Sequence, residues 1–287
     1  MYVLEIPCFD LKSIFLSKQP LRWVKVTDAK YIVFHKDKAL KIEQSKQRIV
    51  FDCTEDEVLS FWWNYFDLSI DYNDLFYKIR SISDELKIIA NRSKGIHILQ
   101  QDVFEMMIYS ILKRTGNESE LMQEIAKRAG IKHGKSMKEM GMVTWYEFPS
   151  SGRMLKKWNC LKDLELGDLS KKIFEISELV SDGWLDINAL VELERSRAFD
   201  YLKSFDDFFN EEEISFICLY ALHQIDKFPL DKNALNALEK FGMSFDDFYD
   251  WYIDGNHEIN MTKGLLRQYL IYTQFNEPKR VEIWMRQ

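Results

Sequence analysis

The 287-residue chain contains little glycine, proline or cysteine, with 11, 5 and 4 residues respectively. Low glycine and proline exclude collagen-like and low-complexity chains and favour a compact, helix-rich protein. The cysteines are too far apart in sequence for a close-spaced zinc or iron–sulfur motif; they are Cys8, Cys53, Cys160 and Cys218. We therefore expect free thiols in a reducing compartment, and neither a metal site nor another cofactor.

The sequence also lacks an apolar run long enough to span a bilayer, and its N-terminus has no basic region followed by an apolar core. This pattern predicts a cytoplasmic protein with no membrane partner. The net charge of −7 has the wrong sign for a protein whose whole surface attracts phosphate. DNA binding would therefore need a local basic face.

Apolar residues make up 46% of the chain, which is long enough for one large domain or for two or three smaller ones. From Leu21 to Cys53 apolar and polar residues alternate, with short turns such as residues 35–38. This alternation predicts an antiparallel meander with one buried face. Thr54 and Glu57 then have the spacing of a capping box at the start of a helix.

After Ile88 the apolar residues follow helical spacing almost to the C-terminus. We therefore divide the chain into a sheet domain at residues 1–90 and a helical body at residues 91–287. Residues 129–136 satisfy a relaxed phosphate-loop pattern, but a true phosphate loop follows a buried strand, whereas residues 121–128 have helical spacing. We interpret this segment as a basic helix end and exposed loop that could contact a polyanion, and we expect no nucleotide cofactor.

Residues 211–231 begin with three acids and end with one. Between them, apolar residues recur at helical spacing from Ile214 to Leu222, and the helix should end before Pro229. Asp231 follows this break. It is therefore expected to open the next helix.

Three separated segments carry the motifs of one family. Residues 217–222, followed by Pro229 and Asp231, resemble an ICL-x-AL helix that continues into P-x-D. Residues 19–23 (QPLRW) resemble a GQ-x-FRW motif, and residues 65–72 (YFDLSIDY) resemble YFDL-x-x-x-Y. These motifs resemble those of the 8-oxoguanine DNA glycosylases, in the helix-hairpin-helix superfamily. The resemblance implies an α+β fold in which a small antiparallel sheet domain packs on a two-part, mostly helical body, with a degenerate helix-hairpin-helix around residues 203–218.

The positions to which this resemblance assigns chemistry are changed. Glu212 stands where the family has its lysine nucleophile, and the hairpin at residues 206–210 (DDFFN) has no glycine. The resemblance places the base pocket at four positions, which are Lys18, in place of a glycine, Tyr220, Arg267 and Ile271. It places the DNA wedge and the duplex-bending position at Thr115, Asn117 and Asp168.

The chemistry that remains depends on Asp231. A bifunctional glycosylase needs an amine that forms a Schiff base with the sugar. Glu212 cannot form an imine, and the register gives no reason to expect Lys203 or Lys227 to substitute, so lyase activity is not expected. Asp231 could stabilise an oxocarbenium-like sugar and activate water, or it could simply be a helix N-cap. A nearby Glu212 would raise the pKa of one of the two carboxylates.

Two functional hypotheses follow. In the first, the chain is a diverged, non-catalytic glycosylase-like protein, related to DNA repair, that binds a protein partner or binds DNA through a non-standard surface. In the second, it is a monofunctional DNA N-glycosylase that uses Asp231 on a base other than 8-oxoguanine, with Lys18 and Arg267 reshaping the pocket.

Overall fold

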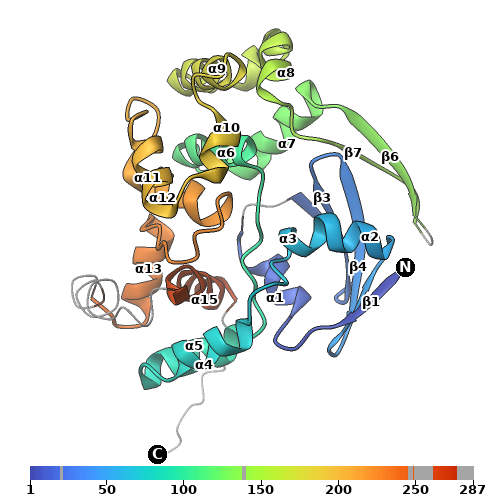
Figure 1. Cartoon of the computed structure of the whole chain (residues 1–287), viewed down its shortest axis with the longest axis vertical. Coiled ribbons are helices and arrows are strands. Elements are labelled where there is room, and N and C mark those ends of the chain that lie inside the picture. The colour runs from blue at the N-terminus through green and yellow to red at the C-terminus, as the bar shows by residue number, and fades with distance from the viewer. Residues whose placement is uncertain (20–21, 138–139, 245–247, 249–260, 277–287) are drawn as a thin grey trace, which may run out of the picture.

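The N-terminal sheet and a larger helical body lie side by side (Figure 1). This architecture comes from a computed structural model, which describes residues 1–19, 22–137, 140–244, 248 and 261–276. The α+β fold expected from the sequence is confirmed, because an antiparallel sheet packs against a mostly helical body.

Within the described residues the N-terminal sheet is antiparallel and five-stranded, in the order β1-β5-β4-β3-β2. The strands are β1 (Tyr2–Glu5), β2 (Arg22–Lys25), β3 (Lys30–His35), β4 (Lys38–Ser45) and β5 (Arg48–Phe51). The predicted meander is present as β2 to β5. Strand β1 was not predicted, and it pairs with β5 so that Tyr2 lies opposite Phe51. Helix α1 (Leu11–Leu16) packs on this sheet, with Phe15 stacked on Tyr31 at 4.5 Å between ring centroids.

The helix predicted after Thr54 is present but irregular. It consists of α2 (Glu55–Glu57), a π-helical turn (Val58–Trp62) and α3 (Trp63–Tyr65). Thr54 accepts a hydrogen bond from the Glu57 amide, as a capping residue does. The Glu57 carboxylate accepts a hydrogen bond from the Trp62 indole at 3.0 Å. This contact accompanies the burial of Trp62 in the core of the sheet domain.

The helical body surrounds α6, which is buried at most of its positions. Its helices are α4 (Tyr72–Arg80), α5 (Asp84–Ser93), α6 (Val103–Leu112), α7 (Glu118–Ala129), α8 (Ser151–Lys156), α9 (Asp168–Ser181), α10 (Ile187–Glu192), α11 (Arg195–Lys203), α12 (Glu211–Tyr220), α13 (Lys232–Lys240) and α15 (Lys263–Phe275). In the described part of the chain no helix has the length and apolarity needed to cross a membrane.

Two apolar cores can be distinguished in the chain. The sheet core contains residues from Phe9 to Phe66 together with Leu99, and the body core begins at Tyr72. Helices α4 and α5 belong to the body core, and the Ser93 hydroxyl donates to the Tyr269 carbonyl of α15 at 3.3 Å. The domain boundary at residue 90 stays a prediction, although the apolar cores divide earlier in the chain.

The expectation of helix throughout residues 91–287 was wrong at one place. Residues 132–146 form a two-stranded hairpin, β6 (Lys132–Met137) and β7 (Gly141–Tyr146), where we expected a helix end and an exposed loop. The hairpin lies alongside the N-terminal sheet (Figure 1). Trp145 stacks on Phe34 at 5.7 Å, and the Lys135 ammonium donates to the Ala39 carbonyl at 3.0 Å. These contacts join residues about a hundred positions apart, which explains why local periodicity did not predict the hairpin.

Candidate functional site

The acidic start of α12 is a well-capped helix N-terminus. The Asn210 side chain accepts from the Glu213 amide, and the Glu213 carboxylate accepts from the Asn210 amide, which completes a capping box. Glu213 is also buried and forms a bidentate ion pair with Arg114, with both N–O distances 2.6 Å. Glu211 is exposed and pairs with Lys203 at 2.6 Å. These acids therefore have structural partners, as the helix dipole favours.

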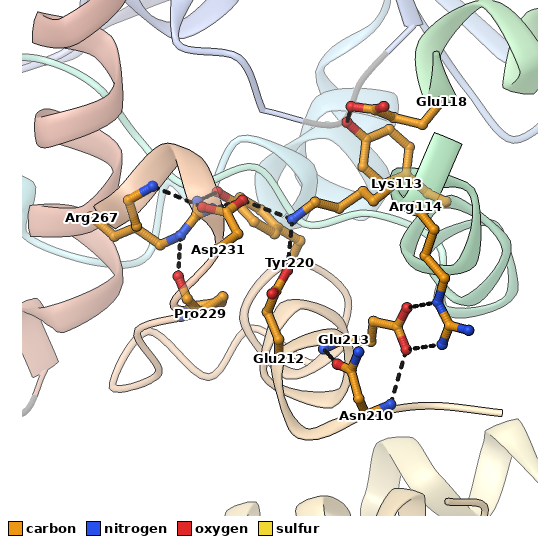
Figure 2. Close-up of polar contacts among 12 residues, drawn as sticks. Lys113, Arg114, Glu118, Asn210, Glu212, Glu213, Tyr220, Pro229, Asp231 and Arg267 are labelled. Carbon is orange, nitrogen blue, oxygen red and sulfur yellow. Dashed lines mark hydrogen bonds and ion pairs between the residues drawn. The ribbon is translucent and has the colours of Figure 1, made fainter. Parts of the chain in front are cut away.

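Asp231 is the N-cap of α13, as predicted, and is held in addition by two cations. Its Oδ1 accepts from the Ala234 amide at 2.9 Å. Its Oδ2 accepts from Lys113 Nζ at 2.7 Å and from Arg267 Nη2 at 2.8 Å (Figure 2). Both carboxylate oxygens are thus occupied, on a residue that is 5% exposed.

The Asp231 carboxylate remains ionised far below neutral pH. Burial alone would raise its pKa, but the charges of Arg267 and Lys113, together with hydrogen bonds from Lys113 and the Ala234 amide, lower the pKa from 3.8 to about 2. The expectation that Glu212 would raise the pKa of a neighbouring carboxylate is therefore wrong for Asp231. The ammonium of Lys113 contacts both acids, with Nζ 3.4 Å from Glu212 Oε1.

Arg267 is one of the four residues predicted for the base pocket, and it lies beside Tyr220 and Asp231. It comes from α15, is 2% exposed, and donates to the Pro229 carbonyl at 2.8 Å and to the Tyr220 hydroxyl at 2.9 Å as well as to Asp231 (Figure 2). Tyr220 in turn donates to Gln268 Oε1 at 2.6 Å. These groups form hydrogen bonds with one another, so the polar groups around Arg267 are satisfied by the chain itself.

Lys113 was not identified from the sequence, although it stands two residues before the predicted wedge position Thr115. It opens a short 3₁₀ turn (Lys113–Thr115) after α6, and its ammonium lies 4.1 Å from the centroid of the Phe216 ring. The two lysines considered from the sequence lie elsewhere, because Lys203 pairs with Glu211 and Lys227 lies over the Phe199 ring. The separation of 118 residues between Lys113 and Asp231 explains why no local pattern revealed the pair.

The structure brings some of the other predicted residues to this region. Thr115 and Asn117 directly follow Lys113 and are exposed, and Ile271 is buried one helical turn beyond Arg267 on α15. Lys18 is exposed, with its ammonium 5.4 Å from the Phe275 ring centroid. The backbone φ of Lys18 is +60°, a conformation that glycine adopts most readily. This agrees with the resemblance, in which the family has a glycine at the position of Lys18.

Asp168 and the degenerate hairpin lie together in a second region. Asp168 is the first residue of α9, and it lines a groove together with Asp207 and Phe208 of the hairpin between α11 and α12. Within the hairpin, the amides of Phe208 and Phe209 donate to the Phe205 carbonyl at 3.0 and 3.2 Å. No group of three or more His, Cys, Asp or Glu side chains placed to hold a metal ion occurs among the described residues.

Comparison with known proteins supports the resemblance inferred from the sequence. Residues 2–107 match the family model of the 8-oxoguanine DNA glycosylase N-terminal domain. No curated protein sequence matches the chain. The fold is therefore compared with solved structures.

Several solved glycosylases share this fold over nearly their whole length. MBOgg1 in complex with a low-affinity DNA ligand is 22% identical, with a TM-score of 0.81 over 94% of this chain and 93% of that chain. The Clostridium acetobutylicum 8-oxoguanine glycosylase/lyase bound to double-stranded DNA is 23% identical, with a TM-score of 0.79 over 92% and 91%. The 3-methyladenine DNA glycosylase of Archaeoglobus fulgidus is 17% identical, with a TM-score of 0.73 over 96% and 99%.

The fold of this chain is therefore the one that these solved DNA glycosylases share. The chain also resembles the 8-oxoguanine DNA glycosylases, because its residues 2–107 match the model of their N-terminal domain.

Proposed function

We propose that this chain is a glycosylase-like protein, related to DNA repair, that binds DNA or a protein partner without excising a base. The observation that supports this most strongly is the occupancy of Asp231, whose two oxygens accept three hydrogen bonds, two of them from cationic side chains. A carboxylate stabilises a developing positive charge on a sugar when its own charge is available to that sugar. The buried guanidinium of Arg267 and the partly buried ammonium of Lys113 already neutralise Asp231.

The filling of the base-pocket position supports the same conclusion. Arg267 is enclosed by the groups to which it donates, and an incoming base would have to displace a guanidinium that forms three hydrogen bonds. Displacing it would leave buried polar groups unpaired, at a cost of about 1–3 kcal/mol for each group. The same argument disfavours a monofunctional glycosylase that acts through Asp231.

Any DNA contact should use a surface other than the hairpin between α11 and α12. Hairpin amides that are already bonded to the Phe205 carbonyl are not free to bind a phosphate, and Asp206 and Asp207 add repulsion. We propose DNA as a partner because the solved neighbours include glycosylases in complex with DNA. The predicted cytoplasmic location remains part of this proposal.

A second candidate function is supported by Lys113. The argument against lyase chemistry was the absence of a lysine at position 212, but an amine from another element lies 2.7 Å from Asp231. An amine condenses with the aldehyde of an abasic sugar to give an imine and water. An abasic sugar carries no base, so Arg267 would not exclude it.

Two assays distinguish these functions. Duplexes that carry a panel of damaged bases are incubated with the protein and treated with hot alkali, and the proposal predicts no strand breaks above background. Breaks that disappear in Asp231→Asn would overturn it in favour of the monofunctional glycosylase. Retardation of DNA in gels at low salt tests binding separately, and loss of any retardation at every salt concentration would remove DNA as the partner.

The second assay adds borohydride to the protein and DNA containing an abasic site. Borohydride reduces an imine to a stable amine, so lyase chemistry would leave a covalent protein–DNA adduct. The adduct should disappear in Lys113→Arg, which keeps the positive charge, and persist in the matched variants Lys203→Arg and Lys227→Arg. No adduct with the wild-type protein would exclude Lys113 as a nucleophile.

A further inference from the structure

The groove beside Asp168 has a volume of about 850 Å³ and lies between α9 and the hairpin that joins α11 to α12. Leu179 of α9 and Phe208 of the hairpin give it apolar surface, and both side chains pack against the body core. Its volume falls in the range of about 300–1,000 Å³ that is usual for binding sites. It shares no lining residue with the charge cluster around Asp231, so the two sites are separate.

One aromatic side chain of the groove is mostly in contact with solvent. Trp184, in the turn between α9 and α10, is 77% exposed. The turn itself is anchored, because the amide of fully buried Leu185 donates to the Leu179 carbonyl at 3.0 Å and the Tyr201 hydroxyl donates to the Trp184 carbonyl at 3.5 Å. Exposed apolar groups mark interaction sites, and tryptophan is enriched among the residues that contribute most to binding. An indole that a fixed turn presents to solvent is therefore typical of a contact for a partner.

The lining of the groove is acidic. Its two lysines are both engaged, since Lys172 donates to the Asp207 carbonyl at 2.6 Å and Lys171 pairs with Glu175 at 3.5 Å. Four further carboxylates have no ion-pair partner among the residues that the structure describes; they are Asp168, Glu178, Asp182 and Asp207. The groove therefore carries negative charge that the chain itself does not neutralise.

Two of these acids stand where they do not stabilise their own helix. Glu178 lies in the last turn of α9, Asp182 is its C-cap, and the last turn contains no basic residue. The helix dipole favours acids at the N-terminus and cations at the C-terminus. The dipole thus explains the acids that begin α12 but not the pair that ends α9 beside Trp184.

These features favour a positively charged ligand with a flat side chain. The carboxylates repel phosphate and so disfavour DNA at this groove. A guanidinium is planar, stacks on the face of an indole and donates to carboxylates. An ammonium forms the same ion pairs but stacks less well, because it is a compact and strongly hydrated charge.

We propose that the groove binds an arginine-containing basic segment of a partner protein. One guanidinium of that segment stacks on Trp184 and donates to Glu178 or Asp182. Apolar side chains of the segment contact Leu179 and Phe208. This choice of partner rests on the proposed function, in which the chain binds a protein without excising a base. The negative charge that disfavours DNA at the hairpin attracts this segment.

The test uses fluorescence anisotropy of the full chain with labelled oligoarginine, and with oligolysine and oligoglutamate of equal length. Oligoarginine should bind, oligolysine should bind more weakly, and oligoglutamate should not bind. Trp184→Ala should weaken oligoarginine binding by about tenfold, the effect of one cation–π contact in a partly desolvated site, and Trp184→Phe should recover part of the loss. Both variants change an exposed side chain and should fold. The matched change Tyr77→Ala removes an exposed ring on α4 and should leave binding unchanged.

A second pair of variants separates a local contact from the net charge of the chain. Glu178→Gln combined with Asp182→Asn should weaken oligoarginine binding by about fivefold, as the loss of two exposed ion pairs predicts. Asp37→Asn combined with Asp56→Asn removes the same net charge from exposed positions of the sheet domain. This control should change the affinity by less than about twofold, because salt screens distant charges.

Three results would overturn the site. They are the absence of oligoarginine binding by the wild-type chain, equal affinities of the wild-type and Trp184→Ala chains, and equal losses from the two double variants, which would mean that only net charge attracts the peptide. Failure of the proposed function is distinguishable from these results, because it is measured as strand breaks in the alkali assay. Strand breaks together with binding that depends on Trp184 would overturn the proposed function and leave the site.

Discussion

The sheet domain and the cluster around Asp231 are stabilised in opposite ways. The sheet core consists of apolar and aromatic side chains such as Tyr31, Phe51 and Trp62, which are fully buried and carry no charge. The Asp231 cluster buries charges, and each charge there is tolerated because the others neutralise it. Each side chain of the sheet core is therefore stabilised by apolar neighbours, whereas each charge of the cluster depends on the others for its neutralisation.

This difference explains which motifs remain in the chain. The match to the family model lies in residues 2–107, where buried apolar residues determine the fold. Glu212 and Arg267, two of the positions with different residues, lie around Asp231 and are accompanied there by Lys113. One set of charged side chains can be replaced by another set whose members also neutralise one another, and the backbone need not change.

The largest effect is expected from removing one charge of the cluster. Asp231→Ala leaves Lys113 and Arg267 without their shared carboxylate and should lower the free energy of unfolding by about 3–5 kcal/mol, as much as Trp62→Ala in the sheet core. Urea denaturation measures both changes. Glu212→Ala is the control and should cost less than about 1 kcal/mol, since its side chain is 39% exposed. Equal costs for Asp231→Ala and Glu212→Ala would contradict the comparison.

A smaller effect is expected on acidification. Because the pKa of Asp231 is lowered from 3.8 to about 2 in the folded chain, its contribution is complete above pH 4 and is lost as the pH falls from about 4 to 2. The loss should be about 2 kcal/mol. It is measured as the difference in unfolding free energy between the wild-type protein and Asp231→Asn across that range. A difference that does not change with pH would show that the carboxylate is not the titrating group.

A substitution at the helix cap tests the contribution of the acidic N-terminus of α12 separately. Asn210→Ala removes the acceptor for the Glu213 amide and should cost about 1 kcal/mol. Thermal unfolding followed by circular dichroism measures the change. The same substitution at exposed Asn233, within α13, should have little effect. If the two variants were equally stable, the capping box would make no contribution.

The last prediction compares the removal of one charge with the removal of three. The triple variant Lys113→Met, Asp231→Leu and Arg267→Met leaves no unpaired cation but loses the α13 cap and the donors to Pro229 and Tyr220, so its stability should exceed that of Asp231→Ala by about 1 kcal/mol and stay below the wild-type value. Chemical denaturation of the triple and of Asp231→Ala on the same scale checks this. A triple variant less stable than Asp231→Ala would mean that the three charges stabilise the fold by more than neutralising one another.

The sequence predicted well those elements that depend only on residues close together in the chain. Alternation between Leu21 and Cys53 predicted the strands, and Asp231 after Pro229 predicted an N-cap, because both depend on neighbouring residues. The hairpin of β6 and β7 was missed because Trp145 and Lys135 find their partners on β3 and β4, far away in sequence. The interaction between Glu212 and Asp231 was misjudged because Lys113 lies between them.

The sequence by itself determined strands β2 to β5, most of the helices, the family resemblance and the absence of a lysine at position 212. These follow from spacing and residue type, which act over a few neighbouring positions. The tertiary structure decided which charges meet, namely that Lys113 and Arg267 both reach Asp231. Such contacts join side chains from separate elements, and only packing of the whole chain brings them within hydrogen-bonding distance.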